Sequence, residues 1–335
     1  MAFMIGSDKV GEIGFGTWGL GGTSTASYDR DGEHTEIIRY AVEKGGLKMV
    51  DTAEMYGGAG HTEELVGRAI KGIPQGGRLR RVQGLANAPA LRRRHKGCQG
   101  EPEELGLSYI DLYLIHWPNS EVDIAETISA MEKLVDEGVT RYIGVSNFTI
   151  DDLEKALPAT KRHDIVANQI KYSVFHREPE EKLIPFCRYN KITVIAYSPP
   201  LNRGNGLQEH RLAEVASASG MTPPVQAALC YVKRQAMPIP KASRKEHVDE
   251  IAGGHRKGAW RGRLQAAQRD LGPHIDPDTV FGFQPQRACG HHVPQVRLGL
   301  RYREYLLVYV QTREADAPPL PRDRICHLVR CLLLS

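Results

Sequence analysis

The chain of 335 residues lacks several features that would place it in a special class of protein. Its six cysteines form no Cys-x-x-Cys pair, which favours reduced thiols over a disulfide framework. No apolar run approaches the roughly 18 residues of a membrane-spanning helix. The opening residues, MAFMIGSDKV, have neither the basic nor the apolar part of a secretory signal. We therefore expect a cytoplasmic protein with no membrane partner.

Basic charge is concentrated in two segments. Residues 73–100 carry a net charge of +7 with no acidic residue, and residues 255–335 carry +6. Because the whole chain totals +4, the remainder carries −9, as an ordinary acidic enzyme surface does. The basic segments contain no RNA-binding motif and no helix-turn-helix pattern, so their charge does not indicate a nucleic-acid partner. Cys289, His291 and His292 lack a fourth ligand at sensible spacing, which argues against a metal site.

Outside those segments, short apolar runs alternate with amphipathic runs. The apolar runs predict strands at 12–18, 47–53, 109–116, 141–147, 165–173, 192–198 and 236–242. The amphipathic runs predict helices at 34–45, 61–72, 124–138, 150–157, 179–190, 210–220 and 224–235. Most of the strands are continuously apolar, which is typical of a parallel sheet buried on both faces.

The alternation predicts an α/β fold. One further strand and helix between residues 73 and 108 would complete eight units, which favours a (β/α)8 TIM barrel over a doubly wound sheet. The glycines of GFGTWGLGG (14–22) are not directly followed by a helix, so they do not form a Rossmann fingerprint. The third-strand region, about 76–103, is abnormal in composition. We expect a barrel over 1–254 and an irregular, poorly ordered extension over 255–335.

Polar side chains stand where six of the predicted strands end. In a barrel of this type, the carboxyl ends of the strands face the active site. Each residue alone has a structural explanation, such as an Asp that caps a helix, but their joint placement points to a site. The residues are Asp51, His116, Ser146, Asn147, Gln169, Tyr197, Ser198 and Lys241.

Four motifs resemble those of the aldo-keto reductase family, in the same order and at similar spacing. They are VDTAEMYGGAGHTEELVGRAIKG (50–72), YIDLYLIHWPN (109–119), RYIGVSNF (141–148) and IPKAS (239–243). The resemblance covers roughly residues 10–72 and 104–254. It implies an oxidoreductase that reduces a small aldehyde or ketone with NADPH, or with NADH as in some members, and that uses no metal. We expect a monomer.

The resemblance assigns catalytic roles to three residues. Tyr56 would protonate the carbonyl oxygen, because hydride that reaches the carbon leaves an alkoxide in need of a proton. Asp51 matches the Asp that supports this chemistry, and His116 matches the His that orients the carbonyl. Trp18 and Trp117 match aromatic walls of the substrate pocket, although packing at the barrel mouth would equally explain them.

The resemblance also implies a set of cofactor-binding residues. Ser146, Asn147 and Gln169 would bind the nicotinamide carboxamide, and Tyr197 would stack on its ring. Ser198 and Leu201 would meet the pyrophosphate. The adenosine 2′-phosphate, whose recognition favours NADPH over NADH, calls for cationic and hydroxyl donors. Its expected ligands are Lys241, Ser243, Arg244 and His247.

One family residue is missing. The family's active-site Lys would fall at 83–85, where the chain reads Gln-Gly-Leu, and no Lys occurs between Lys71 and Lys96. A reading frame shifted by one nucleotide over 78–103 would explain both the composition and the lost Lys, whose codon would span Gln83 and Gly84. Two alternatives remain open: a nicotinamide-nucleotide-binding barrel with impaired or no catalysis, and a chain that folds poorly.

Overall fold

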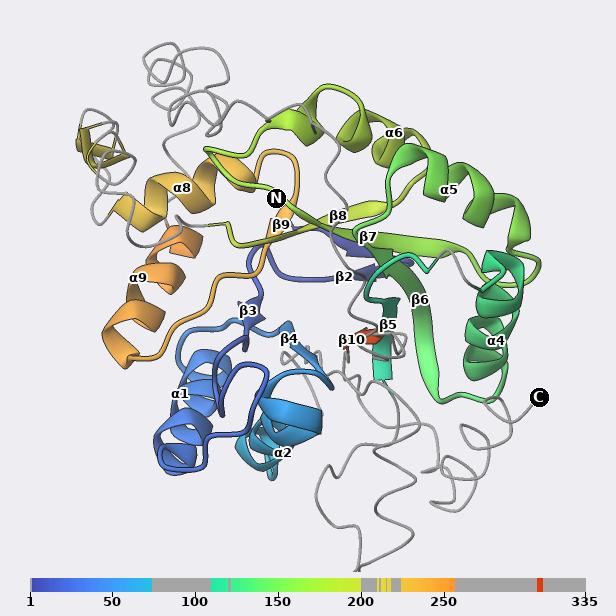
Figure 1. The fold of residues 1–335 in the computed structure, drawn as a ribbon. Coiled ribbons are helices and arrows are strands. Elements are labelled where there is room, and N and C mark those ends of the chain that lie inside the picture. The colour runs from blue at the N-terminus through green and yellow to red at the C-terminus, as the bar shows by residue number, and fades with distance from the viewer. Residues whose placement is uncertain are drawn as a thin grey trace, which may run out of the picture.

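The computed structural model describes residues 2–73, 110–119, 122–199, 210, 212–214, 216–217, 224–256 and 306–309. Strands lie in the centre and helices surround them (Figure 1). The parallel strands are β3 (Phe15–Gly16), β4 (Val50–Ala53), β5 (Ile110–Ile115), β6 (Thr140–Ser146), β7 (Ile165–Lys171), β8 (Thr193–Tyr197) and β9 (Met237–Pro238). Six of them lie within the predicted runs, and β6 begins one residue earlier than predicted, at Thr140. The predicted eighth strand, between 73 and 108, falls outside the described residues, apart from residue 73.

An additional strand, β10 (Leu306–Tyr309), lies between β4 and β5 in the sheet order β3-β4-β10-β5-β6-β7-β8-β9. It is antiparallel to both neighbours and pairs Val308 with Thr52 and with Tyr113. The sequence interpretation had no strand here. In a barrel built only from strand–helix units this place would belong to a parallel strand, so β10 stands where the third strand was expected.

Two backbone hydrogen bonds connect the first and last strands of this order. The N–H of Gly14 donates to Pro238 O at 2.9 Å, and the N–H of Gly16 donates to Pro240 O at 2.9 Å. The region where β3 and β9 meet is tight, because a Cβ on Gly16 would lie 2.7 Å from Ile239 O. The sheet therefore curls so that its two ends meet, as the barrel fold requires.

A small hairpin covers the amino ends of the strands. Its strands are β1 (Met4–Ile5) and β2 (Asp8–Lys9). Asp8, which is buried, accepts a hydrogen bond from Tyr142 Oη at 3.2 Å and pairs with Arg141 at 2.6 Å, both near the start of β6. The opposite, carboxyl ends of the strands are left for a site.

The predicted helices form. They are α1 (Asp31–Glu43), α2 (Gly57–Ile70), α4 (Ile124–Asp136), α5 (Ile150–Ala156), α6 (Leu183–Tyr189) and α8 (Pro224–Val232), and the described residues within 210–217 are also helical. Thr149 caps α5 through a capping box with Asp152. In the described parts of the chain, no helix is long and apolar enough to span a membrane.

One helix was missed at the sequence level. α9 (Lys245–Arg256) follows β9 and packs against α8 and α1. Its buried side chains Val248, Ile251 and Ala252 are spaced three and four residues apart, which is the helical period that could have revealed it. Most of α9 lies within residues 104–254, which the family resemblance covers, although no helix was predicted there.

Candidate active site

A cavity of about 830 Å³ opens at the carboxyl ends of the parallel strands. It brings together most of the residues predicted for the site, from segments that are far apart in the chain. The predicted residues that line it are Trp18, Asp51, Tyr56, His116, Trp117, Asn147, Gln169, Tyr197, Ser198, Lys241, Ser243 and His247. Ser146 lies fully buried behind this lining, and Arg244 is not part of it. Leu201 lies outside the described residues.

Two aromatic rings flank the ring of Tyr56, and a third lies beyond one of them. The Trp18 ring meets the Tyr56 ring edge-on, with centroids 4.8 Å apart. The His116 ring lies 6.2 Å away on another side, and Trp117 stacks beyond His116 at 6.4 Å. Trp18 and Trp117 remain 45% and 50% exposed, so they form the mouth of the cavity rather than its core.

His116 is buried and electrically neutral near pH 7. Burial lowers its pKa to about 4. Its Nδ1 has no hydrogen-bond partner among the described residues. A neutral imidazole beside the Tyr56 ring can donate a hydrogen bond to a carbonyl oxygen from one ring nitrogen without bringing in a charge.

The Tyr56 hydroxyl group is a weak acid in this environment. Burial, followed by the negative charge of Asp51 and by Tyr197, raises its pKa well above the usual range. Asp51 itself is buried at the end of β4 and accepts a hydrogen bond from Gln169 Nε2 at 3.1 Å. Proton transfer from Tyr56 would therefore need a nearby cation to lower its pKa, which is the role implied for the missing Lys.

Asn147 ties three strand ends together. Its Nδ2 donates to His116 O at 3.0 Å and to Ser146 Oγ at 3.1 Å, and its Oδ1 accepts from Tyr197 Oη at 2.9 Å. Ser146 Oγ in turn donates to Gln169 O at 3.0 Å. Asn147 adopts a left-handed backbone with φ of 61°, which Asn tolerates better than most residues. The network fixes the amide and phenol groups on one wall.

Another end of the cavity carries hydroxyl and basic groups. Lys241 Nζ donates to Ser243 Oγ at 3.4 Å, directly after β9. His247 of α9 lines the same cavity. Donors of this kind suit a phosphate group.

Several lining residues were not predicted. They include Met55, Leu212, Val225, Ile239, Glu250 and Ile251. Met55 directly precedes Tyr56, and Glu250 lies three residues after His247 on α9, so proximity to predicted residues could have signalled both. The apolar residues carry no chemical signal of their own, and only the fold brings them to the cavity.

Comparisons with known proteins agree with this site. A family model described as the Aldo/keto reductase family matches residues 12–254. Methylglyoxal reductase YeaE of Escherichia coli (strain K12) is 32% identical over 255 residues, which cover 74% of this chain and 86% of that protein. Aldo-keto reductase YhdN of Bacillus subtilis (strain 168) is 35% identical over 198 residues, or 56% of this chain; the match spans only 58% of YhdN.

A solved structure resembles the fold. The aldo-keto reductase from Klebsiella pneumoniae in complex with NADPH is 31% identical, with a TM-score of 0.66 over 82% of this chain and 98% of that chain. Since the family model matches well over half of the chain, with the expected barrel and motifs, this protein belongs to the aldo/keto reductase family.

Proposed function

We propose that this protein reduces the carbonyl group of a small aldehyde or ketone with NADPH, and that Tyr56 donates the proton. The observation that carries the proposal is the convergence of Tyr56, His116 and Trp18 on one wall of the cavity, beside the Asp51–Gln169 pair. Family membership supplies the reaction class. NADPH, when bound, supplies the hydride.

The described residues fit a nicotinamide nucleotide. Asn147 and Gln169 present amide groups to the cavity, and the Tyr197 ring lies beside them on β8. Lys241 and Ser243 provide donors for a phosphate. We assign Asn147 and Gln169 to the nicotinamide carboxamide, with Ser146 as a buried support. We assign Tyr197 to the face of the nicotinamide ring. Lys241, Ser243 and His247 are assigned to the 2′-phosphate.

Three predicted cofactor ligands remain: Ser198, Leu201 and Arg244. Ser198 lines the cavity with a left-handed φ of 51°, and we assign it to the pyrophosphate together with Leu201. Arg244 lies next to Ser243 in sequence but not in the lining, so a role for it requires its side chain to turn toward the phosphate. Because two of the basic donors line the cavity, we favour NADPH over NADH.

The proton step depends on Tyr56 and its neighbours. Since its pKa is raised, Tyr56 keeps its proton at neutral pH and can give it to a developing alkoxide. His116 holds the carbonyl oxygen within reach, and Trp18 and Trp117 keep water from one side. Burial, Asp51 and Tyr197 all raise the pKa of Tyr56. Without the expected Lys to lower it, the proton transfer is slow.

The test combines binding with turnover. NADPH fluorescence measures the nucleotide site, and oxidation of NADPH with methylglyoxal or an aromatic aldehyde measures the chemistry. Tyr56→Phe should lower kcat by roughly 10²- to 10³-fold with an unchanged Kd for NADPH. Tyr189→Phe is the matched control, because that ring is 87% exposed on α6. Equal turnover of Tyr56→Phe and the wild type would refute the assignment.

The second candidate is a nucleotide-binding barrel with little or no catalysis. The raised pKa of Tyr56 and the absence of a Lys between 71 and 96 favour it. NADPH binding without turnover would support it. Gln83→Lys or Gly84→Lys would then restore reduction if the missing Lys is the cause. Failure of both variants, in a chain that binds NADPH, would rule out that cause.

We also propose the wider setting of the protein. The barrel comprises 1–254, in agreement with the end of the family match, and 255–335 forms an extension that contributes β10. Cys187 and Cys230 are buried free thiols, which suits a reducing cytoplasm. We propose a monomer, with a small carbonyl compound as substrate and no membrane or nucleic-acid partner, and sedimentation of the purified chain tests the monomer.

A further inference from the structure

Residues 17–30 connect β3 to α1 and carry Trp18 at the mouth of the cavity. On one side this loop is fixed to β4, because both the backbone N–H and Oγ1 of Thr17 donate to Asp51 O, at 3.1 and 2.8 Å. Beyond Trp18 the chain turns through Gly19, Gly21 and Gly22, all with positive φ. Within the turn, the N–H of Leu20 donates to Thr17 O and the N–H of Ser27 donates to Gly21 O, both at 2.9 Å. The glycines add no side chains that would fix the turn to the neighbouring helices, so a second anchor beyond Trp18 helps to hold its position.

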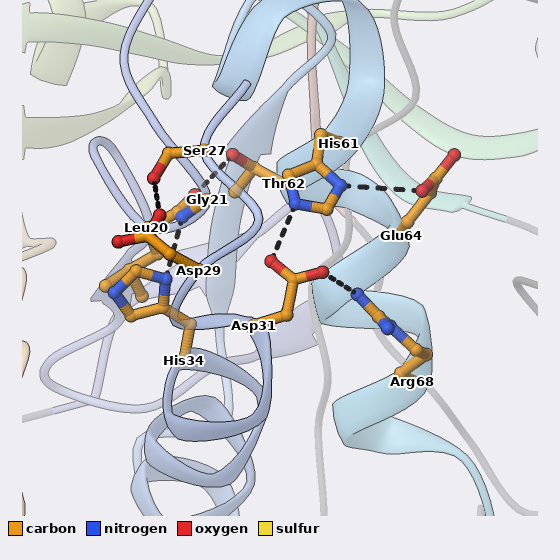
Figure 2. Close-up of polar contacts among 10 residues, drawn as sticks. All are labelled: Leu20, Gly21, Ser27, Asp29, Asp31, His34, His61, Thr62, Glu64 and Arg68. Atoms are coloured by element: carbon orange, nitrogen blue, oxygen red, sulfur yellow. Dashed lines mark hydrogen bonds and ion pairs between the residues drawn. The ribbon is translucent and has the colours of Figure 1, made fainter. Parts of the chain in front are cut away.

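The second anchor lies at Leu20 and Gly21, between α1 and α2 (Figure 2). Thr62 Oγ1 of α2 donates to Leu20 O at 2.6 Å. The N–H of Gly21 donates to Nδ1 of His34, on α1, at 2.9 Å. Gly21 is also pressed against α2, because a Cβ there would lie 2.7 Å from Leu65 Cδ1. The second anchor thus consists of two hydrogen bonds and close packing against α2.

The His34 bond requires one particular protonation state. A backbone N–H can only donate, so Nδ1 of His34 must be the unprotonated nitrogen of a neutral imidazole. The His34 side chain is buried, with 6% of the residue exposed. When His34 takes up a proton, both ring nitrogens become donors, and an N–H would face the N–H of Gly21. Protonation therefore breaks this bond and leaves a buried donor unsatisfied.

Charged neighbours act on His34 from several elements. Burial, and after it the positive charges of Arg30 and of Lys241 following β9, lower its pKa, whereas Glu33 and Asp31 at the start of α1 act in the opposite direction. The net effect is a pKa below 6.5, so the bond to Gly21 is intact at neutral pH and is lost as the pH falls through the lowered value.

The neighbouring His61 behaves differently. Its Nε2 lies 2.8 Å from Asp31 Oδ1, and its Nδ1 lies 3.5 Å from Glu64 Oε2 (Figure 2). Asp31 also binds Arg68 at 2.8 Å. Because both partners of His61 are carboxylates, a protonated His61 would keep them. Of the two histidines around Gly21, His34 is thus the one whose contact to the loop depends on being unprotonated.

We propose that His34 is a positioning residue for the substrate pocket: its unprotonated Nδ1 holds Gly21 and thereby the Trp18 wall, and protonation of His34 releases that wall. The consequence for catalysis rests on the proposed function. Release of Trp18 weakens binding of the carbonyl substrate, while the nucleotide residues on β6, β7 and β8 stay in place. Protonation of His34 should therefore raise KM for the carbonyl substrate and leave kcat and the Kd for NADPH unchanged.

The primary test reads Trp18 directly and requires no turnover. In the full chain with Trp117→Phe and Trp260→Phe, Trp18 is the remaining tryptophan, and acrylamide quenching reports its exposure. Between pH 8 and pH 5 quenching should increase with a midpoint below 6.5. His34→Asn should remove this transition, because Asn Oδ1 accepts at the position of Nδ1 and does not titrate. His163→Asn, at a distant histidine paired with Asp136, should keep it.

His34→Leu completes the set. It fills similar space without an acceptor, so Trp18 should be quenched strongly at every pH. If His34→Leu does not fold, His34→Asn decides alone: an unchanged transition in that variant overturns the proposal. In an active enzyme, His34→Leu should raise KM several-fold and His34→Asn should restore it. A wild type without turnover would count against the proposed function, whereas the quenching result would still decide the role of His34.

Discussion

The amide of Asn147 offers the sharpest quantitative test of how the site is built. Asn147→Ala removes three side-chain hydrogen bonds, to His116 O, Ser146 Oγ and Tyr197 Oη. Each is neutral and is worth about 0.5–1.5 kcal/mol. Ala also has a less favourable left-handed backbone than Asn at φ of 61°, which adds about 1 kcal/mol. Since water can reach part of the cavity, we expect a net loss of about 3 kcal/mol in the free energy of unfolding.

A second variant separates the two contributions. Asn147→Asp tolerates the left-handed backbone and still accepts from Tyr197, but it replaces the Nδ2 donor by an oxygen that faces His116 O. It should lose most of the donor contribution and none of the backbone contribution. Asn190→Ala is the control, because Asn190 makes one comparable bond, from Nδ2 to Phe186 O, remote from the cavity. That change should cost about 1 kcal/mol.

Denaturant unfolding and NADPH fluorescence measure the two consequences of losing Asn147. Besides the loss of stability, Asn147→Ala should weaken NADPH binding about tenfold, since a single lost hydrogen bond can cost about 1.4 kcal/mol. The reasoning is refuted if Asn147→Ala is no less stable than Asn190→Ala and binds NADPH as the wild type does. The hydrogen bonds would then be features of the folded state that carry no net free energy.

Three further predictions address stability and pH. Burial would raise the pKa of Glu132, but hydrogen bonds from the backbone N–H groups of 161–163 outweigh burial and hold the pKa at about 2. Glu132→Gln should therefore destabilise the protein by about 1–3 kcal/mol at pH 7 in urea unfolding. This difference in stability should vanish as the pH falls from 4.5 toward 2. Gly21→Ala, which would place a Cβ against Leu65 at φ of +79°, should lower stability by about 1–3 kcal/mol in the same assay, and an unchanged value would contradict the tight packing of the loop. NMR should show His116 titrating near pH 4, and a midpoint above 6 would mean that it is not buried as described.

Much of this protein could be predicted from local pattern. Continuous apolar runs and 3.6-residue periodicity placed seven strands and the helices between them, because both signals depend only on residues close together in the chain. The capping box of Thr149 and Asp152 is likewise a pattern within a few residues of the chain. The strand-end residues followed from the barrel, since parallel strands bring their carboxyl ends to one face. α9 was missed although its apolar spacing was visible.

Only the tertiary structure decided how the site residues meet. Asn147 bridges His116 and Tyr197, and the N–H of Gly21, in the glycine turn before α1, donates to the unprotonated nitrogen of His34. These contacts join segments that are separated in the sequence. β10 likewise pairs with strands about 190 and 250 residues earlier in the chain. The sequence determined the elements and the chemical groups, because these depend on local propensity. Distances, burial and protonation states depend on packing, which local propensity does not specify.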